Sequence, residues 1–476
     1  MTLIIYVATL LFFVIIGTPI SFALLGCALA LMIHLGMTDP QIVVQNMWDG
    51  ANSFPLLAVP FFMLAGEFMN AGGMTKRIIK LAMAWVGHIK GGLGYVAVIA
   101  AVIMASLSGS AVADTAALAA ILLPMMKSAG YNLPRSGGLI ASGGVIAPVI
   151  PPSIGMILLG VSGQVSIAKL FLAGIVPGIL MGVAIMTTWY VVARKDDVVV
   201  EPRVSMKQRL TETRNAFWAL LLPVIIIGGL KTGFFTPTEA AVIAAWYSLF
   251  VGLFIYREIG FKDLYKLFLA ASKTTAIVLF LVAAASVSAW LVTAVNIPQQ
   301  LGEVLQPFMD NKMLLMVVLM LLGLVMGCVL DFTPNILIMT PVLIPIVKAA
   351  GIDPVYFGVM YILNQCLGLL TPPVGAVLNV ISTVGKMPMN KVVWGVWPFL
   401  LAETGKFVVR IGCLAVIYGP GGLLINLRID QTLRCKHRHK AGADDRKRQT
   451  KRKNALHQPI FFSVMIFPHS GALPAS

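Results

Sequence analysis

Long apolar runs without a single charge recur along most of this chain. A helix needs about 20 such residues to cross the hydrocarbon core of a bilayer. Six runs exceed that length, at residues 3–33, 91–113, 136–168, 170–193, 274–302 and 354–385. The pattern predicts an all-α polytopic membrane protein.

Composition points to the same class. Of the 476 residues, 58% are hydrophobic and 11% are charged, whereas soluble domains carry roughly 25% charged residues. The first run lacks a basic start and is too long for the apolar part of a signal peptide, so we interpret it as permanent membrane helix, although Gly17, Thr18 and Pro19 interrupt it. The five cysteines form no CxxC pair and predict neither a disulfide framework nor a zinc site.

Basic residues mark the polar connections between runs. They cluster at residues 194–214 and again at 257–266, with two expected spans between them, at about 215–230 and 237–256. Two spans return the chain to the same face, which the positive-inside rule assigns to the cytoplasm. A third basic cluster lies in and beside the amphipathic stretch 75–89, which we expect to be an interfacial helix rather than a span.

An internal repeat is the most informative pattern. Gly, Pro and Lys positions recur 221 residues apart, in the pairs Pro124 and Pro345, Lys127 and Lys348, Gly130 and Gly351, Pro151-Pro152 and Pro372-Pro373, Gly174 and Gly395, and Pro177 and Pro398. Such repetition predicts two fused halves, residues 1–195 and 215–403, joined by a charged linker at 196–214.

Residues 404–476 differ in character from the rest. They hold 13 of the 35 Lys and Arg residues but only 3 of the 19 Asp and Glu residues. A basic run can bind nucleic acid or anionic membrane lipid. Because residues 405–476 are unrelated in composition to the rest of the chain and the switch is abrupt, we favour a reading-frame change near Thr404 over a genuine basic regulatory tail, and we expect no nucleic-acid partner.

Two stretches in each half break the rules of a continuous membrane helix. Small polar residues and a carboxylate stand at membrane depth in 106–115, which corresponds to 327–335, and paired prolines interrupt 147–153 and 368–375. Consecutive prolines donate no helical hydrogen bond, so the helix opens and backbone carbonyls become free. Inside a bilayer such carbonyls are tolerated only within protein or beside a water-lined cavity. They suit a desolvated Na⁺ ion.

These breaks have two competing explanations. Glycine and proline also provide kinks and close packing in many membrane helices, without any ligand. Interrupted helices at corresponding positions of two halves, however, are typical of the midplane binding site of a transporter. Because the breaks are duplicated and accompanied by Ser108, Ser110, Asp331 and Asn335, we favour the transporter interpretation.

Five motifs, in order along the chain, carry a resemblance to a known family: FFMLAGEFMNAGGM (61–74), ASLSGSAVADTAALAAILLPMM (105–126), GGVIAPVIPPSIGM (143–156), FTPTEAAV (235–242) and GLLTPPVGAVLN (368–379). From residue 1 to about 403 the chain resembles the DctM-like large permease subunit of tripartite ATP-independent periplasmic (TRAP) transporters, and the motifs are similar to those of members that carry 2,3-diketogulonate. The resemblance implies two inverted repeats with re-entrant hairpins and broken helices, which move as an elevator.

The resemblance also implies a function. The family imports organic acids across the bacterial inner membrane by symport with Na⁺ and receives its substrate from a periplasmic binding protein. A small four-helix membrane subunit holds the large multi-pass subunit, which is not an enzyme. For this chain the first expectation is a sugar acid such as 2,3-diketogulonate and the second is a C4-dicarboxylate, with Na⁺ as the coupling ion.

Candidate site residues lie in the breaks of both halves. Carried over by resemblance, the Na⁺ ligands, largely backbone carbonyls, fall at Ser106, Ser108, Ala147, Ile150, Pro151, Gly327, Gly368, Thr371 and Val374. Polar residues of the same regions are the substrate candidates: Asp114, Ser153, Asp331, Asn335, Asn364 and Asn379. The two carboxylates allow three roles, which are facing the substrate cavity, tuning a cation site, or capping a half-helix N-terminus. An anionic substrate favours Ser153 and the asparagines for direct contact.

Two other function classes stay open as alternatives. An intramembrane hydrolase needs a base for Ser108 or Ser110, yet residues 1–403 contain only His34 and His88. An aspartyl dyad is not favoured either, because Asp114 corresponds to Asn335 in the repeat. A passive channel would leave the paired hairpin signals unexplained.

Overall fold

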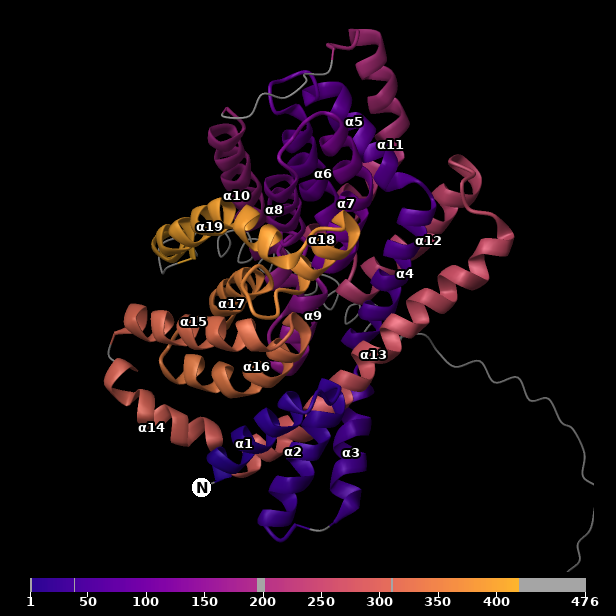
Figure 1. Ribbon diagram of the computed structural model, residues 1–476. Coiled ribbons are helices and arrows are strands. Elements are labelled where there is room, and N and C mark those ends of the chain that lie inside the picture. Colours follow the sequence, from indigo (N-terminus) through magenta and orange to yellow (C-terminus); the bar gives the residue numbers. More distant parts are fainter. Residues whose placement is uncertain (1, 38, 195–201, 310, 419–476) are drawn as a thin grey trace, which may run out of the picture. The chain divides into compact units, whose positions relative to one another are not determined.

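Every element in the described part of the chain is a helix. The computed structural model describes residues 2–37, 39–194, 202–309 and 311–418 (Figure 1). Seven helical segments there are long and apolar enough to cross a membrane: Phe54–Ala71, Ala111–Ser128, Ile167–Ala193, Met206–Thr232, Pro237–Ile255, Phe261–Ala294 and Phe332–Ala349. The predicted all-α polytopic class is therefore confirmed.

The chain divides into two compact units, Met1–Ile411 and Gly412–Ser476. The described part of the second unit is a stretch of helix at residues 412–418. All packing described below lies within the first unit.

Ten α-helices and one short 3₁₀-helix precede the linker. They are α1 (Thr2–Ile15), α2 (Ile20–His34), α3 (Pro40–Ala51), η1 (Phe54–Leu57), α4 (Ala58–Ala71), α5 (Met74–Val86), α6 (Gly92–Ser108), α7 (Ala111–Ser128), α8 (Leu133–Gly144), α9 (Ile154–Ser162) and α10 (Ile167–Ala193). The first apolar run is thus two helices instead of one, because Gly17 takes a positive φ of 83° and Pro19 has no N–H to continue the helix.

Nine α-helices and one π-helical turn follow the linker. They are α11 (Met206–Thr232), α12 (Pro237–Phe250), η2 (Val251–Ile255), α13 (Phe261–Ala294), α14 (Ile297–Met309), α15 (Lys312–Val329), α16 (Phe332–Ala349), α17 (Pro354–Leu369), α18 (Ala376–Gly385) and α19 (Met389–Tyr418). Several of these helices begin just after a residue whose side chain caps the helix N-terminus. In α12, Thr236 and Glu239 form a capping box that satisfies backbone N–H groups in both directions.

Helix boundaries recur at the offset seen in the sequence. α16 begins and ends 221 residues after α7, and α17 begins 221 residues after α8. The clearest departure is α13, a single helix of 34 residues where the first half has α3, η1 and α4. The first half breaks where Pro55 stands just inside η1, whereas Ala276, its counterpart, is compatible with a continuous helix.

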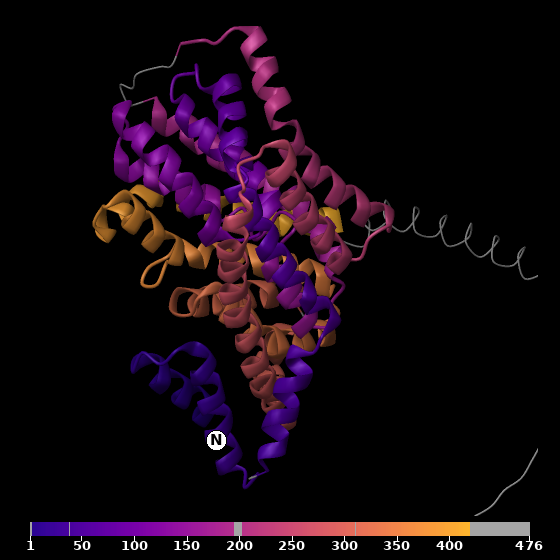
Figure 2. The ribbon, with the colours of Figure 1, turned by 90° about the vertical axis from the view of Figure 1, so that its right-hand side faces the viewer.

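Helices from the two sides of the linker pack against one another. α13 packs along α2, α3 and α4, while α12 packs along α4 and α5 along α11. The long α13 is seen beside α3 and α4 in both ribbon views (Figure 1, Figure 2). α9 packs on α16, so the broken helix of the first half adjoins the hairpin of the second.

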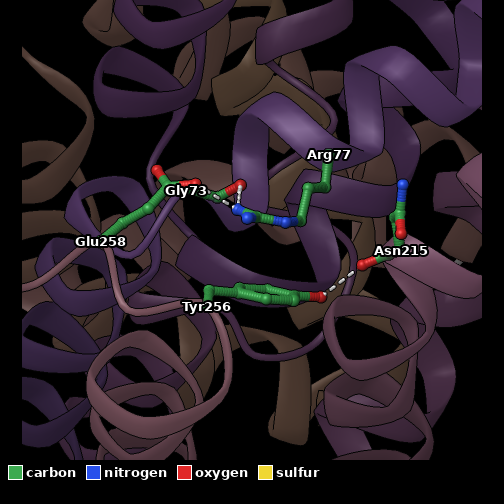
Figure 3. Close-up of polar contacts among 5 residues, drawn as sticks. All are labelled: Gly73, Arg77, Asn215, Tyr256 and Glu258. Carbon is green, nitrogen blue, oxygen red and sulfur yellow. Dashed lines mark hydrogen bonds and ion pairs between the residues drawn. The ribbon is translucent and has the colours of Figure 1, made fainter.

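A polar cluster joins α5 to the segment that follows η2 (Figure 3). Arg77 donates to the Glu258 carboxylate and to the Gly73 carbonyl, and its guanidinium lies over the ring of Tyr256. The Tyr256 hydroxyl donates to the Asn215 carbonyl of α11 at 2.8 Å. Gly73 takes a φ of 71°, and a Cβ there would collide with the Glu258 carboxylate. The cluster therefore depends on glycine at the start of α5.

The C-terminal region is described only in part. α19 continues as helix across Thr404 and ends at Tyr418. Residues 419–476, which make up most of the basic tail, lie outside the described residues, as do linker residues 195–201.

Candidate functional site

The first break is the turn between α6 and α7. α6 ends because Gly109 takes a left-handed φ of 64°. Ser108 donates from Oγ to Asp114 Oδ1 at 2.5 Å and accepts from the N–H of Ser110 at 3.2 Å. Ser110 in turn caps α7 by accepting from the N–H of Ala113. The turn is thus fixed by its own small polar side chains, and both Ser108 and Asp114 are buried.

The second break is the buried non-helical segment between α8 and α9. Ile150 still donates to the Ile146 carbonyl, after which two prolines follow and no N–H is available for the next two carbonyls. Ser153 compensates for one of them, because its Oγ donates to the Pro148 carbonyl at 2.5 Å. The same hydroxyl accepts from the N–H of Met156 and so caps α9. Among the described residues, no side chain compensates in this way for the Ala147 carbonyl.

Both breaks of the first half lie against each other. A Cβ at Gly109 would collide with the Pro152 carbonyl and would lie 3.2 Å from Ser153 Cα. No side chain fits between the hairpin turn and the Pro-Pro segment. The close approach brings the predicted Na⁺ ligands of this half into one region: Ser106, Ser108, Ala147, Ile150 and Pro151, all of them buried.

Several carbonyl oxygens in this region have no hydrogen-bond partner. Within the described part of the chain, no donor reaches the carbonyls of Ala147, Ile150 or Pro151. The carbonyls of Ser106 and Ser108 at the C-terminal end of α6 are also without a donor, as expected of a helix end that lacks a cap. Buried carbonyls are normally paired with protein, water or an ion. The region therefore fits a hard cation, which is coordinated by oxygen atoms.

The corresponding breaks of the second half are built differently. α15 and α17 approach closely at two glycines, and a Cβ at Gly368 would lie 3.0 Å from the Gly327 carbonyl oxygen. Val374 donates its N–H to the Cys328 carbonyl at 3.4 Å, and Thr371 donates from Oγ1 to the Leu367 carbonyl at 2.7 Å. Thr371 and Val374 are half-buried. The Thr371 oxygen keeps lone pairs for a cation, because it uses only its proton in this bond.

Broken elements from the two halves also meet. A Cβ at Gly155, in the first turn of α9, would lie 2.6 Å from the ring of Phe332, the first residue of α16. Ser153 and Asp331, at the N-cap positions of these two helices, therefore belong to neighbouring helix starts. Both Pro151-Pro152 and Pro372-Pro373 are joined by cis peptide bonds.

The candidate substrate residues divide into buried and exposed sets. Asn335 and Asn364 are buried and bonded within the protein: Asn335 donates to Gln365 Oε1 at 2.6 Å, and Asn364 donates to the Met320 carbonyl at 2.9 Å. Ser153 and Asp114 are also buried. Asp331 and Asn379 are exposed, although Asn379 donates to the Val374 carbonyl. Exposure leaves these two available to a ligand.

Neither Asp114 nor Asp331 caps a helix N-terminus through its carboxylate. Ser110, not Asp114, caps α7, and Asp331 occupies the N-cap position of α16 without a side-chain hydrogen bond. Asp114 instead accepts from Ser108 and keeps its buried Oδ2 without a partner. One oxygen of Asp114 is thus uncommitted beside the α6–α7 turn.

Two residues that bond with the buried Asn335 were not among the candidates predicted from the sequence. Tyr361 donates to Asn335 Oδ1 at 3.1 Å, and Gln365 bonds both Asn335 and the Gly323 carbonyl. Gln365 stands beside Asn364 inside a charge-free run, and such a polar pair at membrane depth was a usable signal. No comparable signal in the sequence marked Tyr361, because tyrosine is common in apolar helices.

Comparison with known proteins places this geometry in context. The family model described as the DctM component of the tripartite ATP-independent periplasmic transporter matches residues 7–413. This match extends past Thr404, beyond the span of resemblance expected from the motifs.

The curated relatives match this chain over most of their own length. The 2,3-diketo-L-gulonate TRAP transporter large permease YiaN of Escherichia coli is 54% identical over 86% of this chain and 97% of its own length. The sialic acid large permease SiaM of Vibrio cholerae is 39% identical, over 81% and 90%. The C4-dicarboxylate large permease DctM of Pseudomonas aeruginosa is 38% identical, over 79% and 88%.

A solved transporter shares the fold. The YdaH transporter of Alcanivorax borkumensis superposes with a TM-score of 0.60, covering 79% of this chain and 88% of its own, at 14% sequence identity. At that identity the likeness concerns the fold alone.

Proposed function

The chain belongs to the DctM family of tripartite ATP-independent periplasmic transporters, and on this premise we propose that it is the large membrane subunit of a Na⁺-driven importer of an organic acid. It is a multi-pass protein of the inner membrane and a transport permease, not an enzyme. The coupling ion, the substrate and the moving parts are our proposal.

Unpaired carbonyls in the first half are the observation that carries the Na⁺ proposal. Ala147, Ile150 and Pro151 present buried oxygens that no donor of the described residues reaches, next to the uncapped end of α6. Leaving a buried carbonyl unpaired costs about 1–3 kcal/mol. A Na⁺ ion carried with the substrate would satisfy several of these oxygens at once, and the negative end of the α6 dipole would favour its charge.

Ion binding would also hold the two breaks together. The hairpin turn at Ser108 and the segment at Pro151 touch through Gly109 but share no hydrogen bond within the described chain. An ion ligated from both sides would supply that link. We propose that Asp114, one oxygen of which is free, stabilises the ion through its charge, and that Gly327, Gly368, Thr371 and Val374 form the second Na⁺ site.

For the substrate we propose a sugar acid first and a C4-dicarboxylate second. The order follows the identity to the relatives named for 2,3-diketo-L-gulonate and for C4-dicarboxylates. Asn379 and Asp331 are exposed at the start of α18 and α16, where the positive ends of helix dipoles attract an anion. Of these two, Asn379 is the better contact for a carboxylate because it carries no charge.

We further propose the partners and the motion of the family. A periplasmic binding protein delivers the substrate, and a small four-helix membrane subunit supports this chain. The two halves are inverted with respect to each other, and the hairpins with their broken helices move as an elevator relative to the remaining helices.

Transport in reconstituted vesicles tests this function. The chain and its small subunit are placed in liposomes, and uptake of labelled 2,3-diketogulonate and of a labelled C4-dicarboxylate is followed with and without binding protein. We expect accumulation only with an inward Na⁺ gradient and the matching binding protein. Equilibration without either would indicate a passive channel, and cleavage of the label would indicate a hydrolase.

A proline variant tests the ion site itself. Pro151→Ala returns an N–H that can donate to the Ala147 carbonyl, so it competes with Na⁺ for that oxygen. We expect the Na⁺ concentration for half-maximal uptake to rise. Pro177→Ala, which replaces a buried proline inside α10, is the matched control and should leave the Na⁺ dependence unchanged. An unchanged Na⁺ dependence in Pro151→Ala would reject Ala147 as a ligand.

A further inference from the structure

A cavity of about 540 Å³ opens between α5, α7 and the start of α11. It uses the C-terminal part of α7, whereas the transport site uses the N-terminal end of that helix. Lys76 and Lys80 of α5 line the cavity together with His88, which follows α5. Its apolar lining includes Met83 and, from α7, Ile121 and Met125. A volume of this size lies within the range of about 300–1,000 Å³ typical of ligand pockets.

Helical spacing explains the amphipathic character of this cavity. Lys76 and Lys80 are four residues apart and so share one side of α5. Ile78, Leu81 and Ala82 lie on the buried side. With 13 residues, α5 is too short to span a bilayer, which agrees with a position at the membrane interface. The cavity thus combines cationic groups with an apolar wall where headgroups meet hydrocarbon.

The described lining of the cavity carries more positive than negative charge. Glu212 of α11 is the acidic residue among the lining side chains. Neither lysine forms an ion pair among the described residues. Arg209, between the lining residues Gln208 and Glu212, is only 7% exposed, yet its Nε and Nη2 have no hydrogen-bond partner. Its guanidinium lies 5.9 Å from the centroid of the Trp85 ring on α5.

A buried guanidinium without an anion is unfavourable, because desolvation is not repaid by a charge partner. His88 Nδ1 is likewise buried and unpaired. Two observations therefore point to a missing anion beside α5. One is the cavity lined by Lys76, Lys80 and His88, whose Nδ1 is unpaired, and the other is the Arg209 guanidinium, with its unpaired Nε and Nη2, on the same turn of α11 as the lining residue Gln208. Phosphate is an anion that both lysine and arginine donors bind strongly in proteins.

We propose that this cavity binds a phosphate-bearing anion, with Lys76 and Lys80 on the phosphate and Arg209 adding charge from α11. An anionic phospholipid matches both parts of the cavity, because its headgroup would meet the lysines and its glycerol and acyl carbons would meet Met83, Ile121 and Met125. Free phosphate from solution would use the lysines alone. The ligand joins α5 to α11 and therefore stabilises the folded protein.

Thermal unfolding of the purified full chain in detergent tests the proposal. The unfolding midpoint is measured with added phosphatidylglycerol, with zwitterionic phosphatidylcholine, and with inorganic phosphate. A ligand that binds only the folded state raises the midpoint. We expect phosphatidylglycerol to raise it well beyond phosphatidylcholine, and Lys76→Gln/Lys80→Gln to weaken phosphatidylglycerol binding about tenfold or more through lost charge-assisted hydrogen bonds.

The matched control is Lys262→Gln/Lys266→Gln, which removes two exposed lysines with the same spacing from α13 and should keep the response. Two further variants guard against misfolding. Lys76→Arg/Lys80→Arg keeps the charges and should keep binding, while Glu212→Gln removes the opposing carboxylate and should tighten it.

Each outcome of these measurements either supports or overturns the proposed anion site. Protection by inorganic phosphate equal to that by phosphatidylglycerol, with the same dependence on Lys76 and Lys80, supports the anion site and rejects a lipid as its source. Equal losses in the α5 and α13 variants would show unspecific surface charge and overturn the proposal. Weaker binding in Glu212→Gln, or no selectivity for phosphatidylglycerol and no effect of phosphate, would overturn it as well.

Discussion

Arg77 and Glu258 lie 181 positions apart in the chain and form an ion pair, with 2.5 Å between Nη1 and Oε1 (Figure 3). The Arg77 guanidinium stands 3.7 Å from the centroid of the Tyr256 ring. Burial raises the pKa of the Tyr256 hydroxyl above its ordinary value, so this group stays a neutral donor to Asn215. Arg77 thus links α5 to the segment that follows η2, and Tyr256 links that segment to α11.

Loss of Arg77 should destabilise the protein measurably. We expect Arg77→Ala to lower the free energy of unfolding by about 1–2 kcal/mol, the combined value of a partly exposed ion pair and a cation–π contact. A double-mutant cycle with Glu258→Gln, followed by thermal unfolding, separates the ion pair from the ring contact. Arg257→Ala is the control, since that guanidinium bonds the Phe254 carbonyl instead. Additive effects of the two substitutions would mean that the ion pair contributes nothing.

The orientation of the chain can be tested by labelling. In a background without native cysteines, we expect Lys90→Cys and Arg214→Cys to be labelled only from the cytoplasm, because both lie in basic clusters. Phe234→Cys, 81% exposed between α11 and α12, should be labelled only from the periplasm. The readout is reaction with a membrane-impermeant maleimide on intact cells and on inverted vesicles. Labelling of Arg214→Cys from outside would reverse the assignment.

Removal of the Thr371 hydroxyl should weaken the second Na⁺ site. Thr371→Val keeps the shape of the side chain, so we expect the Na⁺ concentration for half-maximal uptake to rise about fivefold, equivalent to roughly 1 kcal/mol of ion binding. Thr371→Ser should restore the wild-type value. Thr188→Val removes a similar bond to a carbonyl four residues back, in α10, and should have no effect on Na⁺. If Thr371→Val behaves like Thr188→Val, the hydroxyl is structural.

Alanine at Gly109 should disrupt the first site for two separable reasons. A left-handed φ costs a residue with a Cβ about 1–2 kcal/mol. At Gly109 that Cβ would also collide with the Pro152 carbonyl, whereas a Cβ at Gly130, which has a φ of 82°, would meet no atom within 4 Å. We expect Gly130→Ala to lose only the first amount and Gly109→Ala to lose more, together with Na⁺-dependent uptake. Equal unfolding midpoints for the two variants would contradict the close contact.

Much of the architecture follows from local pattern. Charge-free runs identify membrane-embedded segments because charged residues are rare in the bilayer core, although the runs 3–33 and 136–168 each contain more than one helix. Pro151-Pro152 and Pro372-Pro373 identify the breaks because two consecutive prolines leave two neighbouring carbonyls without a helical donor, whereas a single proline such as Pro177 stays inside a helix. The 221-residue offset is evident from the amino-acid sequence alone, and α16 begins and ends at that offset from α7. These features need no knowledge of packing.

The tertiary structure decided which polar groups are already satisfied. Ser153, Asn335 and Asn379 were equal as candidates for substrate contact in the sequence, yet the first two are buried and bonded within the protein and Asn379 is exposed. The partner of Asn335, Gln365, lies on another helix, so this bond is set by how α16 and α17 pack. The cavity beside Lys76 likewise exists only because α5 packs on α11, more than a hundred residues away. Such contacts join distant segments, and hydrophobic spacing within one helix does not encode them.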